Sequence, residues 1–206
     1  MSFIQKITMN DAKVKFGSLS LNNQYQVHFA GFNGNVIRYL KFNRRMNNAQ
    51  DFISREAGLL CSDASLPASA FATAEVKDNF MGIPQEFAHS RLYTDIDFTF
   101  YVDDDYTMLN IFEGWMDYIS SGAEREVADF QKPFYRRMRY PDTYKCDTMF
   151  ISKFEKNAKR ILRYQFINAF PKSITPIPVQ YGSADLLKVN VSFNYDRYIV
   201  ANKRGL

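Results

Sequence analysis

The sequence of 206 residues is short of several residue types, and each shortage excludes a class of protein. Its two cysteines, Cys61 and Cys146, are too few for a disulfide framework and form no CxxC pair, so we expect buried free thiols. Its two histidines, His28 and His89, are far apart and have no second histidine or cysteine at metal-ligand spacing. A zinc site made from these four residues is a minor alternative, and we predict no metal and no cofactor.

Long apolar runs are also missing. The N-terminal MSFIQKITMNDAKVKF lacks the apolar stretch of about 7 to 15 residues that a secretory signal contains, and no window approaches the roughly 18 apolar residues of a spanning helix. We therefore expect a soluble chain that is made in a cytoplasm and has no membrane partner.

Catalytic motifs are absent as well. The chain has no glycine-rich phosphate loop, no GxSxG and no HExxH. The stretch CSDASLP, residues 61–67, places a cysteine beside an aspartate, but Asp63 would raise the pKa of a neighbouring thiol and no general base is close in sequence. We predict that the protein is not an enzyme and that a strand ends at Cys61, before Pro67 interrupts regular pairing.

What the sequence does contain is aromatic residues, with 19 Phe and 13 Tyr, a composition that favours half-buried sheet surfaces. Strict apolar–polar alternation predicts strands at 95–103, 163–170 and 187–196. In 163–170 the alternation puts Asn168 on the face of Phe166 and Ala169 on the other. Weaker signals predict strands at 24–30 and 36–42, and the polar segment 44–54 is typical of a long loop or hairpin tip.

Only one helix is predicted, over residues 108–119. Asp103, Asp104 and Asp105 precede it and suit the N-terminus of a helix; Mg²⁺ or Ca²⁺ binding by the same carboxylates is the less favoured alternative. Ser120-Ser121-Gly122 ends it, and Trp115 is the candidate helix anchor against the sheet. Its apolar stripe consists of Met108, Leu109, Ile111, Phe112, Trp115, Met116 and Ile119. The predicted fold is mainly β, an antiparallel sandwich or barrel-forming sheet with one packed α-helix.

The formal net charge of +4 conceals two opposed blocks. Residues 95–129 hold ten acidic residues against one arginine, whereas residues 132–164 hold ten basic residues against three acidic ones. Two solvated faces would explain this, and so would a surface that meets copies of itself in a fixed direction.

The segment KPFYRRMRYPDTYK, residues 132–145, interleaves basic and aromatic residues. This combination is found on surfaces that bind single-stranded nucleic acid, so a nucleic-acid-binding β-domain is the alternative function. A solvated loop or a protein contact accounts for the segment more simply. No low-complexity linker divides the chain, and we expect an N-terminal arm at 1–22 and a single domain at 23–206.

Three pieces of the sequence, taken in order, resemble the tail tube proteins of contractile-tailed bacteriophages: GLLCSDASLP, IFEGWMDYISSG and RYQFINAFPKSITPIPVQYGSADLLKVNVSFNYDRYIV. The matching features are a strand ending in a Cys-to-Leu-Pro stretch, a short helix with a tryptophan, and a Phe170-Pro171 corner before a long alternating strand that closes on Asp196 and Tyr198. The resemblance covers about residues 60–200. The chain departs from the family by a longer N-terminal arm and a longer basic segment, which leaves open a main tube, a baseplate-proximal ring or a tube-like secretion protein.

The resemblance implies hexameric rings that stack head to tail inside a tail sheath, with baseplate and tail terminator proteins as partners and genomic DNA passing through the lumen without specific binding. It implies a virion protein that is assembled in the cytoplasm of the bacterial host. Assembly contacts are expected from Arg136, Arg137 and Arg139. The candidate lumen face consists of Asp95, Asp97, Lys188, Asn190, Ser192 and Asn194.

Overall fold

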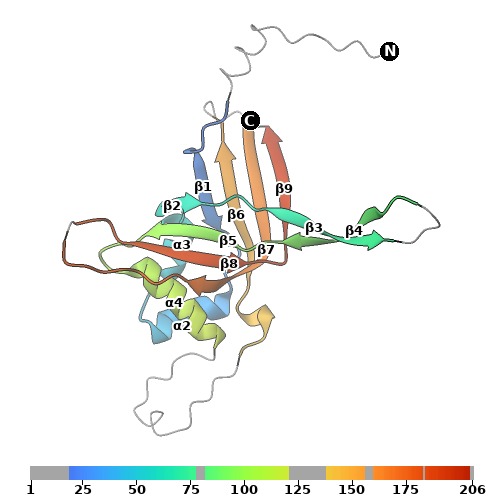
Figure 1. Cartoon of the computed structure of the whole chain (residues 1–206). Coiled ribbons are helices and arrows are strands. Elements are labelled where there is room, and N and C mark those ends of the chain that lie inside the picture. The colour runs from blue at the N-terminus through green and yellow to red at the C-terminus, as the bar shows by residue number, and fades with distance from the viewer. Residues whose placement is uncertain (1–18, 78–81, 121–137, 156–159, 183, 205–206) are drawn as a thin grey trace.

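The computed structural model describes residues 19–77, 82–120, 138–155, 160–182 and 184–204 (Figure 1). Its elements are, in order, β1 (Tyr25–Phe29), α2 (Gly34–Asn43), α3 (Ala49–Arg55), β2 (Cys61–Ala64), β3 (Ser69–Val76), β4 (Gln85–Tyr93), β5 (Ile96–Tyr101), α4 (Thr107–Ile119), the 3-10 turn η2 (Pro141–Thr143), β6 (Cys146–Phe154), β7 (Arg160–Ile174), β8 (Lys188–Asn194) and β9 (Arg197–Arg204). Within these ranges, no helix has the length and apolarity that crossing a membrane requires.

One antiparallel sheet of seven strands forms the body of the protein, in the order β1-β6-β7-β8-β5-β2, with β9 also paired to β7. The long strand β7 belongs to two parts of this sheet. Its first half pairs with β6 and β9, and its last residues pair with β8. Asn168 divides the two halves because its φ of 58° is left-handed, a conformation that asparagine tolerates better than most residues.

The two ends of this sheet approach each other. The Tyr25 hydroxyl on β1 donates to the Cys61 carbonyl oxygen on β2 over 3.1 Å. Between the ends, the ring of Phe29 lies 6.3 Å from Phe100 and 6.1 Å from Phe193, measured between ring centroids. The sheet therefore curls around an aromatic core.

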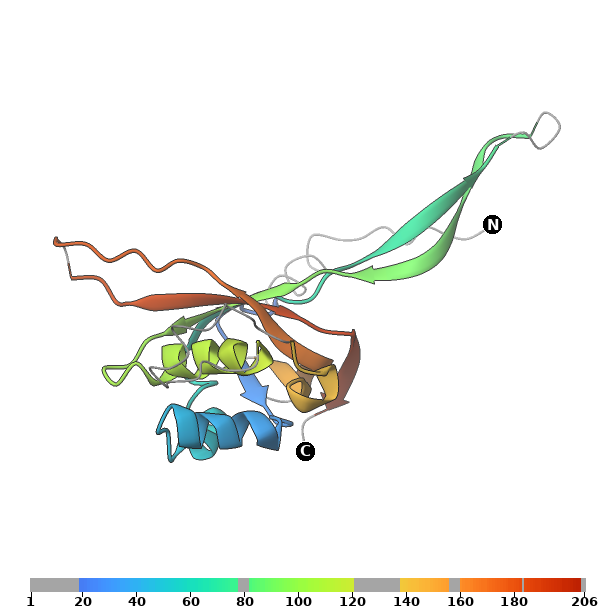
Figure 2. The same ribbon diagram turned by 90° about the horizontal axis from the view of Figure 1, so that it is seen from below.

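The helices cover one side of the β5–β8 part of the sheet (Figure 2). Helix α4 lies directly against the sheet, and α2 packs on α4 on the side away from the strands. The two helices approach closely at Gly114, where an added Cβ would come within 2.5 Å of a Leu40 methyl carbon. An ion pair between Arg44 and Asp117 joins the same two helices.

The predicted fold class is confirmed, since the protein is mainly β with antiparallel sheets. The strand predictions at 24–30, 95–103, 163–170 and 187–196 correspond to β1, β5, β7 and β8. Their alternating residues are buried where β5 and β8 face α4: Ile96, Phe98, Phe100, Val189, Val191 and Phe193 are at most 1% exposed.

Two predictions between residues 36 and 54 were wrong, because both segments are helical. The segment 36–42 lies in α2, where Val36 and Leu40 are buried one helical turn apart and Asn33 caps the N-terminus by accepting from the Asn35 amide. The β-branched and aromatic residues of this segment have a high intrinsic preference for strands, but tertiary packing overrides such weak preferences. In the segment 44–54, residues 49–54 belong to α3, so the body has three α-helices among its described residues and not one.

Two further expectations need correction. Cys61 begins strand β2 and does not end a strand, because the apolar residues before it belong to α3 and the turns that follow α3. In β7 the strict alternation fails at Asn168, where the left-handed residue shifts the phase and buries both Phe166 and Ala169. The residues Phe170 and Pro171 lie within β7 and not at a corner after it.

Candidate assembly surfaces

A polar face runs along β5 and β8 on the side opposite α4. The strand register pairs Asp97 with Ser192, Thr99 with Asn190, and Tyr101 with Lys188, so these side chains share one face. None of the described helices covers this face (Figure 2). The structure therefore brings together four of the six residues that the sequence placed on a candidate lumen face: Asp97, Lys188, Asn190 and Ser192.

The other two residues, Asp95 and Asn194, lie at one end of this face and bind each other. The Asn194 side-chain amide donates to Asp95 over 2.8 Å, and Lys172 of β7 forms an ion pair with the same carboxylate. The hydrogen bond from Lys172 keeps the pKa of Asp95 below its ordinary value. The Lys188 ammonium lies 5.1 Å from the centroid of the Tyr101 ring. Acidic and basic groups thus occur together on this face.

On the opposite face of the same strands, Trp115 lies between α4 and the sheet. It is 0% exposed, and its ring centroid lies 4.4 Å from that of Phe32 and 6.2 Å from that of Phe193. Its indole Nε1 donates to the Tyr144 carbonyl oxygen over 2.8 Å. The tryptophan therefore contacts the sheet, the segment before α2 and the turn before β6.

The three aspartates before α4 have separate environments. The Asp103 carboxylate accepts from the Met108 amide over 3.2 Å in the first turn of α4, as an N-terminal capping role requires. Asp104 and Asp105 are exposed. In the ranges that the structure describes, no three His, Cys, Asp or Glu side chains gather as metal ligands.

The basic segment 132–145 is only partly described: Arg136 and Arg137 lie outside the described residues. Arg139 contacts its own chain, with its Nε donating to the Tyr118 carbonyl oxygen over 2.8 Å and its guanidinium 4.3 Å from the centroid of the Tyr118 ring. Lys145 pairs with Asp196 at 2.8 Å. The described part of the segment therefore stabilises the end of α4 and the turn after β8.

A long hairpin, β3–β4, is the surface that the sequence prediction missed. It extends away from the body of the protein (Figure 2), and a bulge on β4 at His89 interrupts its register. Its alternating residues are mostly alanines, so apolar periodicity was too weak to reveal it. On both sides of the bulge, one face of the ribbon is mostly apolar and carries Ala70, Ala72, Ala74, Val76, Phe87 and Leu92, together with Gln85 and Ser90.

This apolar hairpin face is open to solvent. Phe87 is 54% exposed and Leu92 is 52% exposed, and no described element of the chain covers either side chain. The other face of the ribbon carries Arg91, which contacts Tyr198 of β9. At the base of the hairpin the apolar face therefore points away from the body. An extended exposed ribbon with one apolar face is typical of an interaction surface.

Comparison with known proteins decides the family. A model of the phage tail tube protein family matches residues 20–201. The chain belongs to this family. It is a family of structural tail proteins and not a class of enzymes.

The fold of this tail tube protein is similar to solved structures of contractile injection systems. A chain of the PVC sheath-tube complex in its extended state has a TM-score of 0.51 at 13% identity, over 95% of this chain and 99% of the other. A chain of the anti-feeding prophage tube-terminating cap has a TM-score of 0.54 at 13% identity, over 98% and 100%. A chain of the anti-feeding prophage baseplate has a TM-score of 0.55 at 9% identity, over 89% and 96%. No curated protein matches the sequence.

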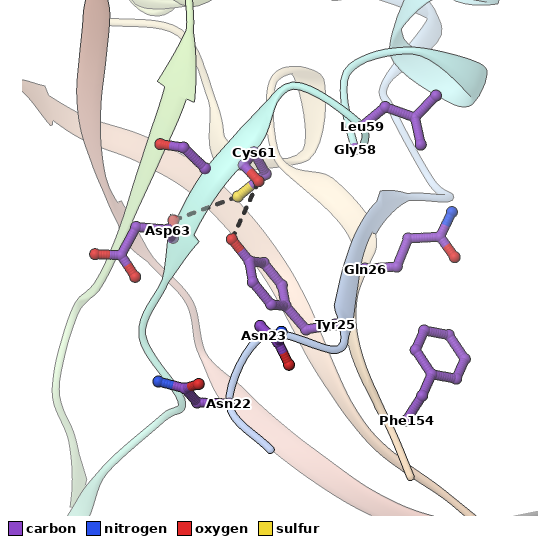
Figure 3. A pocket seen from close by; sticks show the side chains of 10 residues that line it. Asn22, Asn23, Tyr25, Gln26, Gly58, Leu59, Cys61, Asp63 and Phe154 are labelled. Atoms are coloured by element: carbon purple, nitrogen blue, oxygen red, sulfur yellow. Dashed lines mark hydrogen bonds between the residues drawn. The ribbon is translucent and has the colours of Figure 1, made fainter. Parts of the chain in front are cut away.

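The tail tube protein has a pocket at the seam between β1 and β2, lined by Asn22, Asn23, Tyr25, Gln26, Gly58, Leu59, Cys61, Ser62, Asp63 and Phe154. Figure 3 shows the Tyr25 hydroxyl pointing at Cys61 inside it. Of the two thiols expected to be buried, Cys146 is buried and Cys61 is partly exposed. Loss of solvation raises the pKa of the Cys61 thiol to about 12 and that of Cys146 to about 11. Both thiols are therefore protonated at neutral pH. Because the nucleophile is the thiolate and not the thiol, neither cysteine is activated for attack.

Proposed function

We propose that this protein forms the inner tube of a contractile phage tail, with six subunits in each closed ring and rings stacked head to tail. The observation that carries the proposal is the polar face of β5 and β8, which none of the described helices covers and which lies opposite the face that α4 covers. In a ring this face lines the lumen, and the conduit delivers genomic DNA.

The chemistry of the polar face suits passage without binding. A strongly basic lining would hold phosphates and release counterions, and so retain DNA. Here Lys172 is paired with Asp95, and the remaining charged residues of the face are one acid, Asp97, and one base, Lys188. Hydroxyl and amide side chains fill the positions between them.

Ring closure also accounts for the exposed hairpin and the sheet edges. An isolated two-stranded ribbon is marginally stable in water, so β3–β4 gains most from packing on another copy. At the edge strand β9, Ile199 is 45% exposed and Val200 is 47% exposed. A closed barrel shared among subunits removes such edges.

The same arrangement places α2 on the outside of the tube, because α2 lies beyond α4 from the polar face (Figure 2). Its exposed residues include Arg38 and Lys41, and the exposed Arg45 follows its C-terminus. We infer that the tail sheath surrounds this side, and that baseplate and tail terminator proteins contact the two ends of the tube. The protein would then be a virion component that assembles in the host cytoplasm.

Electron microscopy of negatively stained protein, with light scattering on the same samples, tests the proposal. At low salt and high protein concentration we expect six-membered rings and stacks of rings with an open centre. A protein that remains monomeric under these conditions, and whose electrophoretic mobility shifts when single-stranded oligonucleotide is added, would refute the tube and support the nucleic-acid-binding alternative.

A charge variant tests the basic segment separately. Because Arg139 binds Tyr118 within its own chain, it should be left in place to avoid destabilising α4. We expect the double reversal Arg136→Glu with Arg137→Glu to block ring stacking without lowering thermal stability, since weak charge contacts repeated along a tube add up. Intact tubes from this variant would exclude both residues from the assembly contacts.

A further inference from the structure

One arginine joins both strands of the β3–β4 hairpin, at its base, to the body of the protein. Arg91 on β4 donates from the same guanidinium nitrogen, Nη2, to the Ser69 hydroxyl over 3.0 Å and to the Tyr198 hydroxyl over 2.9 Å. The Tyr198 hydroxyl donates in turn to Ser69 over 3.3 Å. These bonds join both strands of the hairpin to β9, which belongs to the body.

Aromatic rings complete this arrangement. The guanidinium carbon of Arg91 lies 5.3 Å from the centroid of Tyr93 and 5.2 Å from that of Tyr198. The rings of Tyr93 and Tyr198 lie 5.4 Å apart with an edge-on angle of 75°. We call Ser69, Arg91, Tyr93 and Tyr198 the Arg91 cluster.

The Arg91 cluster is continuous with the buried core. Tyr93 lies 6.1 Å from Tyr195, which is 5% exposed, and Tyr195 lies 4.9 Å from Phe166, which is 0% exposed. The rest of the hairpin has no such support, because the side chains of its apolar face are exposed. The direction of the hairpin therefore depends on contacts made at its base.

We propose that Arg91 is a positioning residue, which holds the hairpin in one direction in the free subunit so that its apolar face is oriented before it docks on another copy. The docking step rests on the proposed tube function. The hairpin joins the body through two short links, 65–68 and 94–95. Ser65 and Asp95 are bonded to the body, so 66–68 and Thr94 are the residues that we expect to bend when the cluster is broken. Fixing a segment before association removes part of the entropy that binding otherwise costs.

Distances between spin labels in the free subunit test whether Arg91 fixes the direction of the hairpin. Labels at Lys41→Cys on α2 and Glu86→Cys on β4, in a Cys61→Ser, Cys146→Ser background, report the hairpin direction below the assembly concentration. We expect one narrow distance distribution for the parent and a broad one for Arg91→Ala. Arg91→Lys should also broaden it, because a lysine ammonium cannot reproduce the planar guanidinium that bonds Ser69 and Tyr198 and lies near both rings.

The matched control is Tyr198→Phe, which removes one hydroxyl and keeps the ring, and should broaden the distribution less than Arg91→Ala. The melting temperature of the free subunit should stay the same in all three variants. The critical concentration for tube assembly should rise about tenfold in Arg91→Ala, the factor that corresponds to about 1.4 kcal/mol.

An unchanged narrow distribution in both Arg91→Ala and Arg91→Lys would overturn the role of Arg91, whether or not tubes form. A broad distribution with an unchanged critical concentration would overturn its contribution to assembly. If the parent forms no tubes at all, the proposed function fails, whereas the distances still decide whether Arg91 holds the hairpin.

Discussion

The body of the protein and the β3–β4 hairpin use similar residues with opposite results. In the body, Phe98, Phe100 and Phe193 are 0% exposed and pack against α4, whereas on the hairpin Phe71 is 62% exposed and Phe87 is 54% exposed. The body is a sheet with a helix against one face, whereas none of the described elements covers either face of the hairpin beyond its base. Burial therefore follows from the layers that surround a strand and not from the strand's own composition.

This difference predicts two kinds of behaviour. Substitutions in the body should change the free energy of unfolding of the single chain, because each buried ring contributes there. Substitutions on the apolar face of the hairpin should leave that free energy almost unchanged and act on assembly instead. Four experiments test this division, from the largest expected effect on unfolding to the smallest.

Trp115→Ala should have the largest effect, a loss of about 3 to 5 kcal/mol in the free energy of unfolding, because it leaves a cavity between α4 and the sheet. Chemical denaturation of the soluble protein measures the loss, and failure to obtain soluble protein agrees with it. Thermal stability equal to that of the parent would show that α4 does not depend on this contact.

Gly58→Ala should cost about 1 to 3 kcal/mol, since its new Cβ would lie 2.0 Å from the Val27 carbonyl oxygen, where backbone must move to make room. Gly34→Ala at the start of α2 is the matched control, because no atom lies within 4 Å of its added Cβ. It should be neutral or stabilise by up to about 1 kcal/mol. Equal effects of the two variants would contradict the close approach of Gly58 to β1.

Two ion pairs near the C-terminal end of β8 should make stability depend on pH. Hydrogen bonds from Lys172 and Lys145 lower the pKa values of Asp95 and Asp196 respectively. Each pair therefore stabilises the fold fully above the unfolded-state pKa of about 3.9 and ceases to do so as the pH falls through the lowered native value. Melting temperatures measured from pH 6 to pH 2 should decline less steeply in Asp95→Asn with Asp196→Asn than in the parent; identical slopes would contradict this assignment.

Phe87→Ser with Leu92→Ser should have the smallest effect on unfolding, within about 0.5 kcal/mol, as for other exposed positions. The same double variant should abolish tubes in negative stain, because it removes the large side chains of the apolar hairpin face. Glu75→Ser with Glu86→Ser on the opposite face is the control and should still assemble. A large loss of stability in the first variant would show that the hairpin packs on its own body.

The strands with strict alternation were predictable because their pattern reflects local geometry. In β5 and β8 every second residue meets the core, so the sequence alone assigned both faces, including the polar face that now forms the candidate lumen. The helix α4 was predictable from its apolar stripe and from Asp103, which does accept an amide of the first turn. Helix α2 was not, because its Val36 and Ile37 favour a strand unless a partner such as α4 selects the helix.

The mainly β fold, the two faces of β5 and β8 and the helix α4 could be predicted from local sequence, since each depends on residues close together in the chain. Tertiary structure alone decided that β7 bends at Asn168, that β1 meets β2 through Tyr25, and that Arg91 contacts Tyr198 across 107 positions of sequence. Such contacts join residues whose separation no local periodicity encodes, and their energy depends on how the whole sheet curls.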